Sequence, residues 1–229
     1  MPHDAGRDVA TITDIRRSGP AFRRRTIVLD GDPWRDVPAG VVTALALEVS
    51  DEVDRDELDQ RIETTAAPLA RERALRLLTA KERSRAGLRG RLVEDGFSPA
   101  IAETTVADLV RIGLVDDERF ARAYARTLAN ARGVGRSGIA RDLRAAGIDE
   151  ELADSALDEA LGADDESVAA ARLAASAAAR PGATVDRVAA KLMRKGYRLA
   201  VALAAAREAI VARGVESGPD GADGPSFDD

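Results

Sequence analysis

The chain of 229 residues contains no cysteine, a single histidine and few aromatic residues. The lack of cysteine excludes disulfides, thiolate catalysis and zinc sites of the cysteine type. The one histidine, His3, lies in a polar terminus. We therefore expect neither histidine catalysis nor a bound metal, and no other cofactor is predicted. Because aromatic residues make up only 3% of the sequence, the core must depend on Leu, Val, Ile and Ala, and alanine buries little area per residue.

Long apolar runs are also missing. No segment approaches the roughly 20 apolar residues that a membrane-spanning helix needs, and the first residues, "MPHDAGRDVA", lack the hydrophobic region of a signal peptide. We therefore expect no membrane partner. The absence of cysteine indicates a reducing cytoplasm, and the chain is expected to be a monomer. The formal net charge of −6 argues weakly against binding to nucleic acid, although such an average hides local patches.

Strand character is confined to the first part of the chain, residues 9–37. The β-branched and apolar run Thr26–Leu29 precedes Asp30-Gly31, a dipeptide typical of two-residue hairpin turns. Two short helices are expected after the hairpin, the second beginning near Asp54 or Asp56 and the unit ending at Pro68. The sequence thus predicts a small mixed N-terminal domain over 9–66, after a disordered segment 1–8.

From Leu69 onward the sequence is helical and repeats itself, since segments 88–110, 139–161 and 188–210 align without a gap. Each copy places a glycine just beyond a helix, where a positive φ ends it, and an apolar residue that folds back: Gly96-Phe97, Gly147-Ile148 and Gly196-Tyr197. A further helix is expected before each pair, at 69–80, 117–131 and 165–179.

The predicted fold is mainly α, a tandem repeat of three three-helix modules that form a short curved α-solenoid behind the small mixed α/β domain. The module boundaries are placed at 69–115, 116–162 and 163–213, and residues 214–229 are expected to form a disordered acidic tail.

Helix starts are marked by capping residues. Ser98 and Asp149 are expected to cap the third helices of the first two modules, while Arg198 in the third copy should start its helix less well. Asp116 or Asp117 caps the helix 117–131, along which Phe120, Tyr124 and Leu128 form a stripe expected to lie in the core.

Charge is segregated within each module: the first two helices are basic and the third is acidic. One interpretation is a solvated surface with exposed ion pairs of well under about 1 kcal/mol each. The other is a basic stripe that lies against a charged polymer or filament. The candidate partner-binding residues are Arg83, Arg85, Arg89, Arg119, Arg122, Arg126, Arg132, Arg136, Arg141, Lys191, Arg194 and Lys195.

The stretch "GVGRSG" at 133–138 matches G-x-G-x-x-G, a dinucleotide-binding pattern. It follows an expected helix instead of a strand, and no βαβ unit surrounds it, so we interpret it as the connection between two helices. The pair Asp116-Asp117 is better explained by helix capping than by acid–base chemistry. We do not expect an enzyme.

The stretches "GLVDDERFARAYA" (113–125) and "GVGRSGIARDLRAAGI" (133–148) resemble the RecX family of recombination regulators, as does "KERSRAGLRGRLVEDGF" (81–97). The resemblance implies tandem three-helix modules that bind RecA, sit in the groove of the RecA–DNA filament and inhibit its ATPase and strand-exchange activities. Such a protein regulates homologous recombination, DNA repair and the SOS response. The hypothesis for the site is that Arg119, Arg122, Arg126, Arg132, Arg136 and Arg141 contact an acidic RecA surface or DNA phosphate.

A helical DNA-binding transcriptional regulator is the alternative, because each glycine turn joins two helices as a helix-turn-helix does. The chain offers no helix with the polar and arginine pattern that reads base edges. Direct binding of DNA through the basic stripe remains open under both hypotheses.

Overall fold

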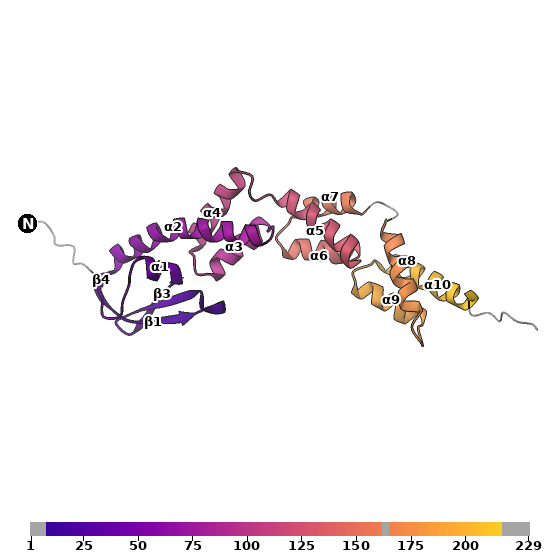
Figure 1. Ribbon diagram of the computed structural model, residues 1–229, viewed down its shortest axis with the longest axis horizontal. Helices are drawn as coiled ribbons and strands as arrows, with labels where there is room; N and C mark the ends of the chain where they lie inside the picture. The colour runs from indigo at the N-terminus through magenta and orange to yellow at the C-terminus, as the bar shows by residue number, and fades with distance from the viewer. Residues whose placement is uncertain (1–7, 162–164, 217–229) are drawn as a thin grey trace, which may run out of the picture. The chain divides into compact units, whose positions relative to one another are not determined.

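The computed structural model describes residues 8–161 and 165–216, and it divides the chain into two compact units, Met1–Phe120 and Ala121–Asp229 (Figure 1). The expected disordered segments fall almost wholly outside the described residues. The last helix nevertheless extends to Glu216, into the segment expected to be a tail.

The first unit begins with a four-stranded antiparallel sheet. Its strands follow the order β3-β2-β1-β4 and have the bounds β1 Val9–Ser18, β2 Arg24–Leu29, β3 Asp32–Pro38 and β4 Glu52–Asp54. The predicted hairpin joins β2 to β3, and its turn residues Asp30 and Gly31 both have positive φ, 52° and 93°, as a type I′ turn requires. The sequence did not predict β4, which is only three residues long.

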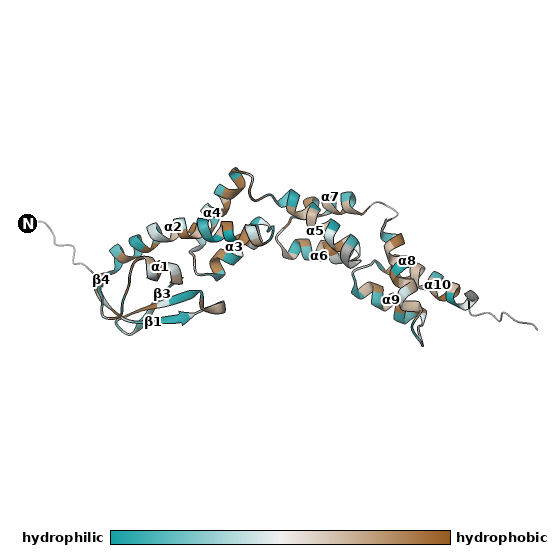
Figure 2. Cartoon of the chain, viewed as in Figure 1, coloured by the Kyte–Doolittle hydropathy of each residue, from teal (hydrophilic) through white to brown (hydrophobic). Residues whose placement is uncertain are grey.

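Helix α1 (Ala39–Ala44) contacts β2, β3 and the long helix α2 (Arg55–Ala80). The side chain of Asp54 caps α2 by accepting from the amide of Glu57 at 3.0 Å, which confirms the predicted start. The prediction that Pro68 ends this unit is wrong, because Pro68 lies inside α2. Buried residues continue on both sides of it, from Leu58 to Leu77, and this apolar stripe outweighs the one backbone hydrogen bond that proline forgoes (Figure 2).

Helices α3 (Arg85–Glu94) and α4 (Pro99–Arg111) complete the first unit. One hydrophobic cluster runs from Ala10 in β1 to Val115 beyond α4 and includes Leu58, Leu92 and Leu109. The sheet and the first three-helix region therefore share a single core, and α2 contributes to both parts.

The second unit contains most of α5 (Asp117–Arg132), then α6 (Arg136–Ala145) and α7 (Glu150–Ala160). Helices α8 (Asp165–Ala178), α9 (Val185–Arg194) and α10 (Leu199–Glu216) follow and pack on one another around an alanine-rich core. These bounds confirm the helices predicted before and after each glycine turn.

The three repeated turns are built alike. Gly96, Gly147 and Gly196 have φ of 100°, 79° and 85°, and each following amide reaches back to the helix it leaves. The amides of Phe97, Ile148 and Tyr197 donate to the carbonyls of Leu92, Leu143 and Leu192 at 3.1, 3.1 and 3.2 Å. This is the Schellman arrangement, which satisfies the last helical carbonyls, and it confirms the predicted role of the glycines.

The predicted stripe on α5 needs correction. Leu128 is buried, but Phe120 and Tyr124 are only half-buried, whereas Ala121 and Ala125 have no exposed surface. The small alanines let α5 approach its neighbours closely, which displaces the aromatic side chains to the edge of the core. Asp116 is confirmed as the cap, because its carboxylate accepts from the amide of Arg119 at 3.0 Å.

Within the two described stretches, no helix has both the length and the hydropathy needed to cross a membrane. The same residues bring together no group of three or more His, Asp or Glu side chains suited to a metal ion.

Candidate partner-binding surface

Arg119, at the start of α5, is held by its own unit. Its Nε lies 2.6 Å from a carboxylate oxygen of Glu82, and its guanidinium also donates to the carbonyls of Gly113 and Leu114. The hydrogen bond to Glu82 raises the pKa of Arg119 above its ordinary value. Asp117 does not cap α5; its carboxylate accepts from the amide of Arg85 at 2.8 Å, so it caps α3 instead.

Arg122 and Arg126, one turn apart on α5, share one acid of α7. The Nε of Arg122 lies 2.7 Å from Glu159, and the guanidinium of Arg126 pairs with the other oxygen of the same carboxylate. Their side chains keep 44% and 58% of their surface exposed, so both remain accessible to a partner.

Arg136 bridges α6 to two acids of α7. Its guanidinium lies 2.7 Å from Asp158 and 3.2 Å from Asp154. Burial lowers the pKa of Arg136, but the hydrogen bonds to Asp158 and Asp154 outweigh it, and the net shift is upward. Because this side chain ties two helices together, its removal would disturb the packing as well as the surface.

Three further candidates of the first two helical regions, Arg85, Arg89 and Arg141, are also paired. Arg85 lies 3.8 Å from Asp117, Arg89 lies 2.8 Å from Glu103, and Arg141 lies 3.2 Å from its neighbour Asp142. Lys191 and Arg194 occupy the last turn of α9, where cations interact favourably with the helix dipole, and Lys195 caps that helix's C-terminus. The side chain of Arg132 lies outside the described residues.

Basic and acidic segments that are separate along the sequence thus lie next to each other in the structure. The basic helices pack against the acidic third helix of the same region, α3 on α4 and α6 on α7, so candidate arginines stand beside carboxylates. The surface combines guanidinium groups with acids instead of forming a purely basic stripe. Exposed pairs of this kind contribute about 0–1 kcal/mol each, so a partner that supplies its own carboxylates or phosphates can compete for the arginines.

The segment 133–138 spans the α5–α6 connection and the first residues of α6, and its glycines allow two backbones to touch. The amides of Gly135 and Ser137 donate to the carbonyls of Lys195 and Gly196 at 2.9 and 3.1 Å. A Cβ on Gly135 would lie 2.6 Å from the Gly196 backbone. We call this contact between the segment 133–138 and the α9–α10 turn the glycine clasp. The sequence suggested a turn but not this contact, which joins residues far apart in the chain.

A buried acid completes the glycine clasp. Glu166, only 6% exposed, accepts from the amide of Arg136 at 3.1 Å and from the guanidinium of Arg198 at 3.2 Å. It therefore caps α6 from α8. The hydroxyl of Tyr197 donates to the carbonyl of Gly133 at 3.2 Å, and burial raises the pKa of this tyrosine.

A second cluster, in the first unit, was missed from the sequence. Asp95, 4% exposed, lies beneath three arginines: Arg73 at 2.6 Å, Arg91 at 3.4 Å and Arg23 at 3.9 Å. The one available signal was its position, because an acid at a helix C-terminus opposes the helix dipole and needs cationic partners. Arg83 lies next to this cluster, and burial together with the charges of Arg91 and Arg73 lowers its pKa.

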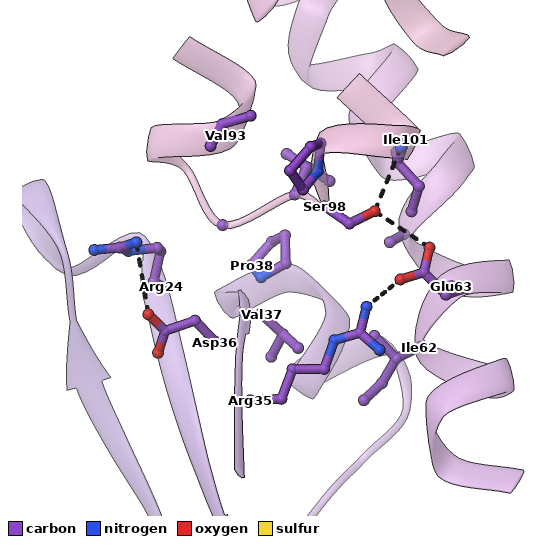
Figure 3. Close-up of a pocket in the computed structure, with 14 residues that line it drawn as sticks. Arg24, Arg35, Asp36, Val37, Pro38, Ile62, Glu63, Val93, Ser98 and Ile101 are labelled. Atoms are coloured by element: carbon purple, nitrogen blue, oxygen red, sulfur yellow. Dashed lines mark hydrogen bonds and ion pairs between the residues drawn. The ribbon is translucent and has the colours of Figure 1, made fainter. Parts of the chain in front are cut away.

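A pocket of about 360 Å³ marks the junction between the sheet and the first helical region. In Figure 3, Glu63 of α2 accepts from Arg35 of β3 on one side and from Ser98, at the start of α4, on the other. Gly96 lines the same pocket, and a Cβ there would lie 3.0 Å from the carbonyl carbon of Val37. These contacts join the sheet, α2 and the start of α4 within the first unit.

The fold and these surfaces define a helical protein of three-helix domains behind a small sheet. Two family models match it: "RecX, first three-helix domain" over residues 70–109 and "RecX, second three-helix domain" over 116–157. The chain belongs to the RecX family of regulatory proteins, a family of regulators without enzymatic activity.

Curated relatives and a solved structure agree. The chain is 35% identical over 161 residues to regulatory protein RecX of Thermobifida fusca, covering 66% of this chain and 87% of that protein. It is 40% identical over 108 residues to the RecX protein of Mycolicibacterium vanbaalenii, an alignment that spans 47% of this chain and about half, 56%, of that relative. A crystal structure of regulatory protein RecX matches with a TM-score of 0.56 and 25% identity, over 89% of this chain and 99% of that one.

Proposed function

We propose that this protein regulates homologous recombination and DNA repair by binding RecA or the RecA–DNA filament and inhibiting its ATPase and strand-exchange activities. Membership of the RecX family is the observation that carries the proposal. The protein acts in the cytoplasm as a monomer, without cofactor or metal.

The proposal includes a third module built from α8, α9 and α10. Its support is the repetition of the same Schellman turn at Gly196, with the same apolar contact through Tyr197, as at Gly96 and Gly147. Three modules with one geometry suit a partner that is itself a repeating polymer.

The partner surface is proposed to include Arg122 and Arg126. Both are accessible and share Glu159, so an acidic group of RecA or a DNA phosphate can replace that carboxylate with little net cost. Arg136 contributes to the packing instead, since it holds two acids of α7.

The test is ATP hydrolysis by RecA on single-stranded DNA with increasing amounts of the protein. We expect inhibition, and we expect the double change Arg122→Ser with Arg126→Ser to weaken it while helicity by circular dichroism stays unchanged. The matched control is Arg111→Ser, which removes an exposed arginine paired with Asp108 on α4 and should leave inhibition intact.

Absence of inhibition by the unaltered protein would overturn the proposal. Tight, salt-resistant binding to one duplex sequence would then favour the transcriptional-regulator alternative. Unchanged inhibition by the double variant would show that these two arginines serve solvation only.

A further inference from the structure

The first unit carries a groove lined by arginines, and the partner surface proposed above, with Arg122 and Arg126, does not include it. It measures about 610 Å³, and two glycines, Gly87 and Gly90, leave it open. Nothing lies within 4 Å of a Cβ built on Gly90. Five arginines line it: Arg23, Arg73, Arg76, Arg83 and Arg91. They come from the loop before β2, from α2, and from the loop and helix that follow α2.

The groove has more positive charge than its acids balance. Asp95 is buried beneath the arginines, and Glu94 is the one acid among the lining residues. The Nε of Arg83 is buried with no hydrogen-bond partner among the described residues, and its positive neighbours Arg91 and Arg73 disfavour its charge further. Guanidinium groups gathered in this way suit phosphate, which they bind in a bidentate manner.

An apolar pocket of about 360 Å³ continues the arginine groove. The two share Arg23, Arg73 and Arg76, and the pocket adds Phe22 together with Pro38 and Leu69. Phe22 is 65% exposed and is the one aromatic among the exposed large hydrophobic residues of the described chain. An aromatic face is thus presented to solvent next to a line of arginines.

The backbone holds Phe22 in place at some cost. Phe22 and Ala21 both have φ of 52°, in the left-handed region that a bulky residue rarely adopts. The carbonyl of Phe22 accepts from the guanidinium of Arg25 at 2.7 Å, and the next residue, Arg23, accepts from the amide of Ala39 at 2.8 Å. The surrounding contacts maintain a strained backbone angle at an exposed aromatic residue. Such maintained strain is typical of functional sites.

We propose that this groove binds single-stranded nucleic acid directly, with phosphates on the arginines and an unstacked base on Phe22. An aromatic platform beside a basic groove is the arrangement by which proteins hold single strands without reading sequence. A duplex does not fit, because its bases are stacked and offer no face to Phe22. The site is separate from the arginines of α5 and needs no RecA.

The test uses the full chain without RecA and a fluorescein-labelled oligothymidylate of roughly 16 nucleotides, within the usual length of such sites. Fluorescence anisotropy is measured for this strand, for an abasic strand of equal length, for a duplex and for a poly-aspartate peptide. We expect the oligothymidylate to bind best. Phe22→Ala should weaken its binding about tenfold, as loss of one stacked base does, and should leave binding of the abasic strand unchanged.

Arg76→Ser tests the phosphate contacts, because the Arg76 side chain is 63% exposed and its ion pair with Glu72 is long, at 3.7 Å. It should weaken binding of both strands and reduce the slope of log K against log salt by about 0.7. The matched controls are Ile112→Ala for Phe22 and Arg111→Ser for Arg76, both on exposed residues outside the groove. Helicity by circular dichroism checks the fold of each variant.

Equal or better binding of the duplex or of the poly-aspartate peptide would overturn the proposal, as would an equal effect of Phe22→Ala on both single strands. RecA inhibition by Phe22→Ala is measured separately. If the unaltered protein does not inhibit RecA but binds single strands as expected, the proposed function is wrong and the proposal of this binding site is supported.

Discussion

Gly138 and Gly196 meet backbone to backbone, so closely that a Cβ added to Gly196 would lie 2.4 Å from the Cα and the amide nitrogen of Gly138. We predict that Gly196→Ala destabilises the second unit by about 3 kcal/mol. Roughly 1–2 kcal/mol comes from the positive φ of 85°, and roughly 1–3 kcal/mol from the overpacking. Urea unfolding followed by circular dichroism measures the change.

Gly182→Ala is the matched control. Gly182 also has a positive φ, 70°, but a Cβ there would meet only the end of Arg187 at 3.6 Å. This variant should lose only the conformational part, about 1–2 kcal/mol. Equal losses at the two positions would show that the glycine clasp contributes nothing beyond the backbone angle.

The buried pair of Asp95 and Arg73 stabilises the first unit. Asp95→Ala leaves Arg73, which keeps only 18% of its side-chain surface exposed, without its carboxylate. We predict a loss of about 2–4 kcal/mol, since breaking a buried ion pair leaves one charge uncompensated. Asp108→Ala removes an acid paired with an exposed arginine and should cost under about 1 kcal/mol. Thermal and urea unfolding of the two variants decide between them.

Glu166 links α8 to the start of α6 and to Arg198. Glu166→Ala removes the acceptor of the Arg136 amide, and we predict a loss of about 1–3 kcal/mol, the cost of an unsatisfied buried donor. Glu150→Ala, at an exposed position of α7, should change stability by less than about 0.5 kcal/mol. Hydrogen exchange of the Arg136 amide should rise in the Glu166 variant alone; unchanged exchange would contradict the capping role.

Acid should weaken the hairpin through Asp30. Its carboxylate accepts a hydrogen bond from the amide of Thr11 and another from the side chain of Arg55. These two hydrogen bonds, the first having the larger effect, hold the pKa of Asp30 below the ordinary 3.8. Because the folded-state pKa is the lower one, the stabilisation is present above pH 3.8 and is lost as the pH falls through the folded value. Asp30→Asn should flatten the fall in unfolding free energy between about pH 5 and pH 2.5. Asp32→Asn is the control, and an identical profile in both variants would contradict this assignment.

The sequence predicted features that depend on a few neighbouring residues. The hairpin followed from Asp30-Gly31, and the glycine turns followed from one residue type at one place in each repeat. Such signals are local because a positive φ or a cap is decided within a single turn.

Features that depend on distant residues were missed or predicted wrongly. Pro68 is tolerated because the buried stripe of α2 continues beyond it, which only the tertiary packing reveals. Arg122, Arg126 and Arg136 have partners on α7, and Asp95 has partners from a loop and two helices. The partners of a charged residue and the burial of a side chain depend on which helices pack together. The spacing of residues along one helix does not determine this packing.

The position of helix α2 in the core determines how the first unit unfolds. Its buried residues from Leu58 to Leu77 belong to one cluster with the sheet and with α3 and α4, although the match to the first RecX domain begins only at residue 70. A chain cut at that match would lose the first half of α2 and the sheet, and would expose buried residues of the remaining half of α2. The unit of homology and the unit of cooperative unfolding are therefore different, and residues 8–120 should melt in a single transition.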